Sequence, residues 1–173
     1  MVKLVLSLGS NLGDRFLNLK TACARLTESG LVIDIKSSSV YETEPQDMKS
    51  ENSFFNTVIV CQTNISPVEI LNLIKSIETD MGRVQSPVYQ DRIIDIDIIS
   101  YGDKIVRAHN LIIPHPKMHL RPFVLVPLQE IDAGFTHPVL NFNPAQMLSK
   151  IKGNYKVKKV EGIQLDGQIK NNT

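Results

Sequence analysis

Two aspartates, Asp95 and Asp97, stand two residues apart in the segment DRIIDIDIISYGD, residues 91–103. In an extended strand both side chains point to one face, while the isoleucines around them point to the other. Carboxylates held that close repel each other unless cations or hydrogen-bond donors lie between them. Paired carboxylates beside a loop are a common way to hold Mg²⁺ together with substrate phosphates, although an exposed strand face would show the same pattern. The segment therefore requires positive charge nearby.

Four positively charged or protonatable side chains flank this segment. Arg83 and Arg92 border the preceding loop, and His115 and Arg121 lie in the proline-rich stretch PHPKMHLRP that follows. Guanidinium groups match phosphate oxygens in a two-point contact, and a histidine fixed between two prolines is typical of a functional loop. Each side chain alone could instead form a surface ion pair or bind a loop carbonyl. Their gathering around a carboxylate pair favours phosphate binding.

The stretch FFN offers an aromatic ring and an amide on one strand face, because Phe54 and Asn56 are two residues apart. This combination suits a flat heterocycle with donors and acceptors on its edge. Core packing is the simpler explanation of the aromatic residues when the stretch is taken alone. The sequence leaves both interpretations open.

The turn GSNLGD near the N-terminus could be mistaken for a phosphate-binding glycine loop. It has neither the G-K-[ST] ending nor the G-x-G-x-x-G spacing of such loops. We expect Ser10, Asn11 or Asp14 to cap the following helix instead.

Regular structure around these residues follows from hydrophobic periodicity and from start and stop signals. The strongest signal is at Ser66, Pro67 and Glu69, where a cap, a first-turn proline and a capping box coincide. The sequence predicts strands at 2–8, 31–41, 54–63 and 93–101 and a short partner strand at 104–107. It predicts a first helix that ends at Gly30, two further helices at 67–81 and 122–128, and a last one that begins at 144. Leu148 and Ile151 are expected on the inner face of the last helix. This order predicts an α/β (α+β) fold, a ferredoxin-like split βαβ sheet with helices packed on one face.

Length, charge and cysteines limit the class of protein. The 173 residues fit one domain, which we place at 1–151, followed by a peripheral tail at 152–173 with at most one weak strand. A net charge of +1 gives no reason to expect a nucleic-acid partner, and no apolar run is long enough for a membrane span. Because Cys23 and Cys61 both lie in apolar patterns, we expect reduced thiols and a cytoplasmic location. We also expect a monomer that binds small-molecule substrates.

Six motifs taken together resemble one known family. In chain order they are GSNLGD, YETEP, FFN, IETDMGR, DRIIDIDI and PHPKMHLRPFVLVPL, and they extend from about residue 4 to 131. The chain resembles 6-hydroxymethyl-7,8-dihydropterin pyrophosphokinase of folate biosynthesis (the HPPK family). The resemblance implies a ferredoxin-like fold and transfer of pyrophosphate from ATP to the hydroxymethyl group of the pterin, with release of AMP.

The resemblance also implies roles for individual residues. Asp95 and Asp97 would hold two Mg²⁺ ions and, with Arg83 and Arg92, form the catalytic set. The ATP-binding residues would be Glu78, Arg83, Arg92, His115 and Arg121, and the pterin-binding residues Thr43, Phe54, Asn56, Tyr89 and Phe123.

The sequence departs from the family pattern in the loop before the aspartates. Gln85 stands where many members have a further arginine, and VYQDR replaces the frequent W-G-P-R, which puts Tyr89 in place of a tryptophan. The segment QDMKSEN also lacks a glycine that usually follows TEP. We expect the polar loops at 44–52 and 83–91 to close over ATP and exclude water. A two-metal nucleotidyltransferase and a non-catalytic nucleotide- or pterin-binding descendant are the alternatives.

Overall fold

The computed structural model describes residues 1–46, 50–84 and 90–165. Its elements in chain order are β1 (Val2–Ser10), α1 (Arg15–Glu28), β2 (Val32–Ser37), β3 (Tyr41–Thr43), β4 (Phe54–Thr63), α2 (Pro67–Asp80), β5 (Asp95–Tyr101), β6 (Val106–Ala108), β7 (Leu111–Ile113), a 3₁₀ turn (Met118–Leu120), α3 (Pro122–Ile131), α4 (Pro144–Leu148) and β8 (Val157–Lys159).

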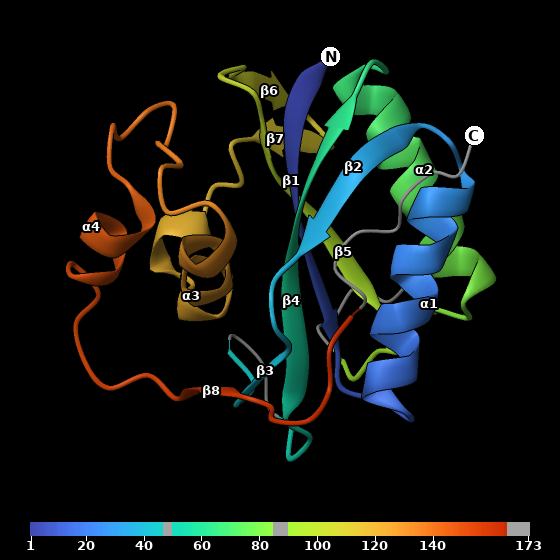
Figure 1. Ribbon diagram of the computed structural model, residues 1–173, viewed down its shortest axis with the longest axis vertical. Helices are drawn as coiled ribbons and strands as arrows, with labels where there is room; N and C mark the ends of the chain where they lie inside the picture. The colour runs from blue at the N-terminus through green and yellow to red at the C-terminus, as the bar shows by residue number, and fades with distance from the viewer. Residues whose placement is uncertain (47–49, 85–89, 166–173) are drawn as a thin grey trace.

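The main sheet has the strand order β5-β1-β4-β3-β8, and β2 also pairs with β4. Strand β1 lies in the centre, antiparallel to both β4 and β5 (Figure 1). The chain therefore runs through two βαβ halves whose outer strands flank β1 and β4, which confirms the predicted ferredoxin-like split βαβ fold. The single strand predicted at 31–41 is divided into β2 and β3, which pair with successive parts of β4.

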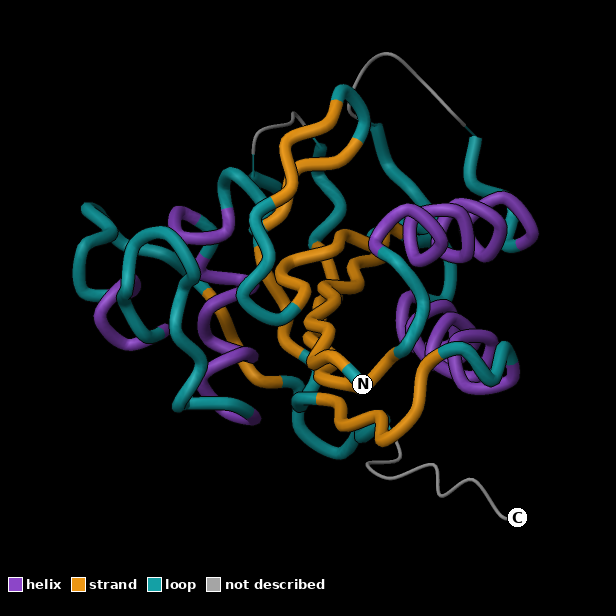
Figure 2. The backbone as a smooth tube through the Cα atoms, turned by 90° about the horizontal axis from the view of Figure 1, so that it is seen from above, coloured by secondary structure: helices purple, strands orange, loops and turns teal. Residues whose placement is uncertain are grey.

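Helices cover both faces of this sheet, so the prediction of helices on one face is wrong. In Figures 1 and 2, α1 and α2 lie on one side of the strands and α3 and α4 on the other. The reason is that the central strands carry buried apolar residues on both faces of the sheet. Leu4 and Leu6 of β1 pack in the core under α1 and α2, whereas Val5 of β1, Val58 of β4 and Ile99 of β5 pack in a second core with Leu125 of α3. A strand buried on both faces is typically covered by helices on both.

The two long helices begin and end where the sequence predicts. The side chain of Asp14 caps α1 by accepting a hydrogen bond from the backbone N–H of Leu17 at 3.0 Å. Ser66 and Glu69 form the capping box of α2. Gly30 follows α1 with a φ of +65°, a left-handed conformation that glycine adopts without strain.

One of two predictions for the second half of the chain is wrong. The strand expected at 104–107 begins at Val106 and pairs with β7 instead of β5, because the turn at Gly102 leads the chain away from the main sheet and the next segment supplies its own partner. In α4, Pro144 and Met147 are buried, and Leu148 and the following Ile151 are partly buried and pack against the same core, on the inner side that the sequence predicts. The helix itself ends at Leu148.

The segment after residue 152 contains the one weak strand that the sequence predicts. This strand, β8, pairs with β3 at the edge of the sheet. Farther on, Leu165 is buried in the core beneath α1 and α2, and its carbonyl accepts a hydrogen bond from the hydroxyl of Ser37 at 3.3 Å. The segment therefore contributes both a strand and a core side chain.

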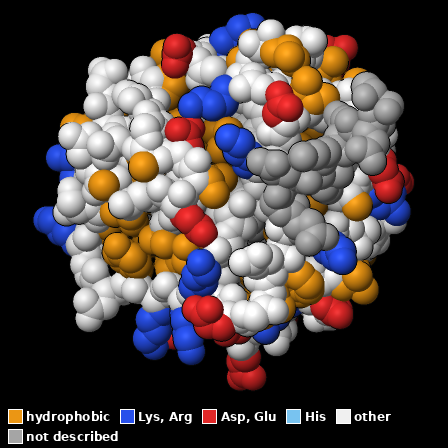
Figure 3. All heavy atoms as spheres, viewed as in Figure 1, with side chains coloured by type: hydrophobic (Ala, Val, Ile, Leu, Met, Phe, Trp, Pro, Cys, Tyr) orange, Lys and Arg blue, Asp and Glu red, His pale blue; other side chains and the backbone are white. Residues whose placement is uncertain are grey.

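Charged side chains of both signs are mixed on the surface. On the face seen in Figure 3, Lys and Arg are interspersed with Asp and Glu, in keeping with a net charge of +1. Among the described residues, no helix has the length and apolar character needed to cross a membrane.

Candidate active site

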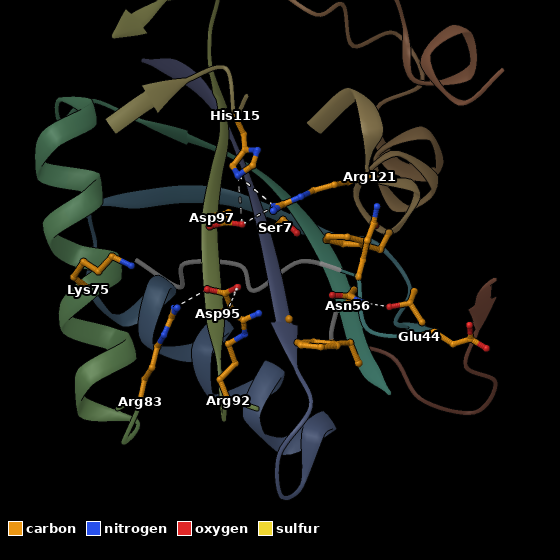
Figure 4. A pocket seen from close by; sticks show the side chains of 15 residues that line it. Ser7, Glu44, Asn56, Lys75, Arg83, Arg92, Asp95, Asp97, His115 and Arg121 are labelled. Atoms are coloured by element: carbon orange, nitrogen blue, oxygen red, sulfur yellow. Dashed lines mark hydrogen bonds and ion pairs between the residues drawn. The ribbon is translucent and has the colours of Figure 1, made fainter. Parts of the chain in front are cut away.

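One pocket opens at the end of the sheet where β5 begins. Its lining comes from β1, β3, β4, α2, β5 and the segment that leads into α3 (Figure 4). The lining residues are Ser7, Gly9, Thr43, Glu44, Gln46, Phe54, Asn56, Lys75, Arg83, Arg92, Asp95, Asp97, His115, Arg121 and Phe123. Most of the residues singled out in the sequence therefore meet in one place.

The aspartate pair lies on the pocket face of β5, as strand alternation predicts. Ile94, Ile96 and Ile98 are buried on the opposite side, beneath α1 and α2. The carboxylates of Asp95 and Asp97 both line the pocket, close to the central strand β1. The strand thus anchors its position through isoleucines and presents its charges to the cavity.

Each aspartate has its own cationic partners. Asp95 accepts hydrogen bonds or ion pairs from Arg83 Nη1 at 2.6 Å and from Arg92 Nη1 at 3.3 Å. Asp97 accepts from Arg121 Nη1 at 3.1 Å and lies 3.8 Å from His115 Nε2. Arg83, Arg92 and Arg121 supply the positive charge that the sequence required, and the fourth expected residue, His115, lies beside Asp97.

Burial shifts the protonation of two groups in this cluster. Desolvation, followed by the charge of Asp95, raises the pKa of Asp97, while Arg121 acts in the opposite direction. Desolvation and the neighbouring Arg121 lower the pKa of His115 to about 4. At neutral pH the His115 side chain is therefore uncharged. It lies beside the carboxylate of Asp97, whose negative charge is only partly balanced by Arg121.

Glu78, on the last turn of α2, is buried and does not line the pocket itself. Its carboxylate accepts hydrogen bonds from Arg83 and from the backbone N–H of Ile96, the latter at 2.8 Å. It also binds Lys75 Nζ at 2.8 Å. Glu78 therefore fixes two pocket cations to α2 and β5.

Lys75 is the cation that the sequence analysis missed. It is half-exposed, lines the pocket and points toward the aspartates in Figure 4. Lys75 precedes Glu78 by three residues in α2, and residues three apart lie on one helix face. That spacing was the available signal.

The other half of the pocket is mainly neutral; its one acidic side chain among the described lining residues, Glu44, pairs with Lys156 Nζ at 2.8 Å. Phe54, Asn56, Thr43 and Phe123 line it, and Asn56 Nδ2 donates a hydrogen bond to Thr43 Oγ1 at 2.7 Å. Asn56 pairs across the sheet with Gly9, where an added Cβ would lie only 2.8 Å from Asn56 Oδ1. The absence of a side chain at Gly9 leaves room for the amide.

Two residues discussed in the sequence analysis lie outside the described residues. They are Tyr89, predicted to bind the pterin, and Gln85, which stands where many family members have a further arginine. The predicted closure of loops 44–52 and 83–91 also involves residues outside this range.

The residues present fit Mg²⁺ bound together with a polyphosphate. Among the described residues there is no group of three or more His, Cys, Asp or Glu that would enclose a metal without other ligands. Mg²⁺ in nucleotide enzymes is usually held by one or two carboxylates plus phosphate oxygens and water, which is the donor set that Asp95 and Asp97 offer. Arg121 Nε is buried without a hydrogen-bond partner in the described part of the chain, as expected of a group that binds a ligand oxygen.

The pocket therefore combines a cation-rich half around two carboxylates with a neutral half of aromatic rings and an amide. The charged half suits a polyphosphate, and the neutral half suits a flat heterocycle. Such a combination suits transfer of a phosphoryl-type group to a heterocyclic acceptor.

Comparison with known proteins assigns the chain to a family. Residues 5–133 match the model of 7,8-dihydro-6-hydroxymethylpterin-pyrophosphokinase (HPPK), and the chain belongs to this family. It is 38% identical over 126 residues to the 2-amino-4-hydroxy-6-hydroxymethyldihydropteridine pyrophosphokinase of Bacillus subtilis, covering 73% of this chain and 75% of that protein. It is 37% identical over 139 residues to the Aquifex aeolicus protein of the same name, covering 80% and 86%.

Some relatives are much longer. The chain is 41% identical over 142 residues to the folic acid synthesis protein FOL1 of Dictyostelium discoideum, which covers 82% of this chain but only 21% of that protein. A crystal structure of wild-type HPPK-DHPS from Plasmodium falciparum with pteroate matches with a TM-score of 0.69 at 20% identity, covering 86% of this chain and 42% of that one. The structural likeness agrees with the fold described above.

Proposed function

We propose that this protein transfers the pyrophosphoryl group of ATP to 6-hydroxymethyl-7,8-dihydropterin, giving the pterin diphosphate and AMP in folate biosynthesis. The observation that carries the proposal is that a single pocket joins Asp95 and Asp97, with their cations, to the neutral wall around Phe54 and Asn56. Membership of the HPPK family supports the same reaction.

In this proposal the charged half binds the triphosphate. Arg83, Arg92, Lys75 and Arg121 contact phosphate oxygens and neutralise the charge that spreads over them during transfer. His115, uncharged at neutral pH, donates a hydrogen bond to a phosphate oxygen. Glu78 does not contact the nucleotide in this proposal; it contributes by holding Arg83 and Lys75 in place through hydrogen bonds.

The neutral half binds the pterin. Phe54 and Phe123 contact the faces of the ring, and Thr43 and Asn56 bond to its edge; Tyr89 is proposed as a further contact. Because Asn56 donates a hydrogen bond to Thr43, both side chains are held in fixed orientations before the ligand binds. Holding the hydroxymethyl oxygen in line with the β-phosphorus then supplies much of the rate enhancement.

Two Mg²⁺ ions held by Asp95 and Asp97 are proposed as cofactors, and when bound they would polarise the phosphoryl oxygens. The raised pKa of Asp97 supports a cation here, because a second positive charge would relieve the repulsion between the carboxylates. We further propose a cytoplasmic location, in keeping with two buried free thiols, Cys23 and Cys61. The protein is also proposed to be a monomer.

A product assay tests the proposal. Purified protein is incubated with Mg²⁺, ATP and 6-hydroxymethyl-7,8-dihydropterin, nucleotides are separated by chromatography, and an Asp95→Ala/Asp97→Ala variant serves as the control. We expect AMP and pterin diphosphate in equal amounts, and neither with the variant. Release of free pyrophosphate with AMP attached to the acceptor would instead indicate a nucleotidyltransferase. ATP binding without turnover would indicate a binding protein.

A further inference from the structure

A buried amide and a carboxylate join three separate loops beside the pocket. Asp91 Oδ1 accepts hydrogen bonds from Asn11 Nδ2 at 2.7 Å and from Ser50 Oγ at 2.5 Å, and Asp91 Oδ2 accepts from Asn52 Nδ2 at 2.6 Å. Asn11 is 3% exposed. These four residues, here called the loop clip, tie the turn before α1 and the segment before β4 to the residue that precedes Arg92.

The loop clip also determines which way the amide of Asn11 points. An ionised carboxylate can only accept hydrogen bonds, so the nitrogen of the amide must face Asp91. The oxygen of the same amide then faces the other way, and it accepts the backbone N–H of Arg92 at 2.8 Å. The backbone N–H of Asn11 in turn donates to the carbonyl of Arg92 at 3.2 Å. The backbone of Arg92 is thus held on both its donor and its acceptor side.

Arg92, like Arg121, spans the two halves of the pocket. Its Nη1 lies 3.3 Å from Asp95 Oδ2, and its guanidinium carbon lies 5.6 Å from the centre of the Phe54 ring. Its side chain is only 13% exposed, so there is little space for it to adjust if its backbone moves.

We propose that Asp91 is a positioning residue: by orienting the amide of Asn11, it fixes the backbone of Arg92 so that the guanidinium reaches the bound nucleotide phosphates. The inference rests on the proposed function for the identity of the ligand. Asp91 itself does not line the main pocket. The hydrogen bonds from Ser50, Asn11 and Asn52 lower the pKa of Asp91, which keeps it an acceptor at neutral pH.

A reciprocal exchange of the two side chains provides the test. In Asn11→Asp, two carboxylates face each other and the interaction with Asp91 is lost. In Asp91→Asn, one of the three hydrogen bonds becomes a contact between two donors. In the double variant Asn11→Asp/Asp91→Asn, the introduced amide can donate to the introduced carboxylate and to Ser50 and can accept from Asn52, so the loop clip is restored with its polarity reversed.

The primary measurement is the dissociation constant of α,β-methylene-ATP with Mg²⁺, and kcat and KM are measured beside it. We expect Asn11→Asp to weaken nucleotide binding about 10- to 100-fold and Asp91→Asn about threefold, since small misplacements of a binding group have effects of this size. The double variant should return to within about threefold of wild type. Asp103→Asn, in the exposed turn after β5, is the matched control and should change nothing.

Repeating the series in an Arg92→Ala background separates positioning from general destabilisation. If the loop clip acts through Arg92, Asn11→Asp should cause less than about a twofold further loss in that background. An undiminished further loss, or a double variant no better than Asn11→Asp, would overturn the proposal. If Asn11→Asp does not fold, Asp91→Asn with and without Arg92→Ala decides in the same way. Binding that follows this pattern without any AMP formation would refute the proposed reaction and leave the positioning role standing.

Discussion

The two halves of the pocket are built on opposite principles. In the charged half, Asp95 and Asp97 are already paired with Arg83, Arg92 and Arg121, so the groups that would bind a ligand bind one another first. In the neutral half, Asn56 and Thr43 share one hydrogen bond and the aromatic rings need no partner.

This difference has consequences for ligand binding. A polyphosphate must break existing ion pairs in order to form new ones. Its net binding free energy is therefore the small difference between the energy gained from the new pairs and the energy lost with the old ones. A flat heterocycle enters a preformed slot and gains mainly from burial and from its edge hydrogen bonds. Changes in the charged half should therefore alter both catalysis and stability, whereas changes in the neutral half should alter acceptor binding alone.

The largest effect is expected from Asp97→Asn. We expect kcat to fall about 10³-fold, because stabilisation of the developing charge by a metal is worth several kcal/mol. The melting temperature should not fall, since the raised pKa of Asp97 means that its charged form is disfavoured in the folded protein. Steady-state kinetics and thermal unfolding check both parts. A variant that keeps more than about a tenth of the activity would contradict the assignment of Asp97.

The next largest effect is expected in how the free energy of unfolding depends on pH. The pKa of His115 is about 4 in the folded protein and about 6.5 when exposed, so the unfolded chain takes up this proton first. The stability that His115 contributes is therefore present above pH 6.5 and lost as the pH falls toward 4. Asp97 acts with the opposite sign, because its pKa is raised on folding.

Replacing either His115 or Asp97 should reveal how the other residue changes the free energy of unfolding with pH. With Asp97→Asn, we expect the free energy of unfolding between about pH 6.5 and 4.5 to fall more steeply than in wild type, because the opposing contribution of Asp97 is removed. With His115→Asn it should fall less than in wild type. Urea titrations at a series of pH values measure both slopes. Identical slopes in all three proteins would show that the two groups do not titrate as proposed.

The smallest effect is expected in the neutral half, from Gly9→Ala. The added methyl would lie 2.8 Å from Asn56 Oδ1 and 3.5 Å from the Phe54 ring, so the amide must shift. We expect KM for the pterin to rise about tenfold, equal to about 1.4 kcal/mol, with nucleotide binding unchanged. Gly134→Ala, where the new methyl meets no atom within 4 Å, is the control. A loss of ATP affinity in Gly9→Ala would show that the halves are not independent.

Local signals account for the parts of the fold that the sequence predicts well. The capping box at Ser66, the glycine after α1 and the alternation of Asp95 and Asp97 with isoleucines depend on neighbours a few residues away. The four partners of the aspartates could also be expected from the sequence, since each lies within 24 residues of its aspartate in the chain.

Features that depend on distant contacts could not be predicted in this way. GSNLGD offered three candidate caps, and only the folded chain shows that Asp14 caps α1 while Asn11 is bound by Asp91, 80 residues away. The placement of α3 on the second face of the sheet likewise depends on contacts across the sheet, such as those between Val5 and Leu125.

Strand β8 has a further consequence for the behaviour of the protein at high concentration. It covers the edge of β3, where backbone groups would otherwise be open to pairing with another chain. The new outer edge is only three residues long and carries Lys158 and Lys159, both exposed. Short, lysine-bearing edges resist edge-to-edge association, so this strand protects the sheet from aggregation as well as extending it.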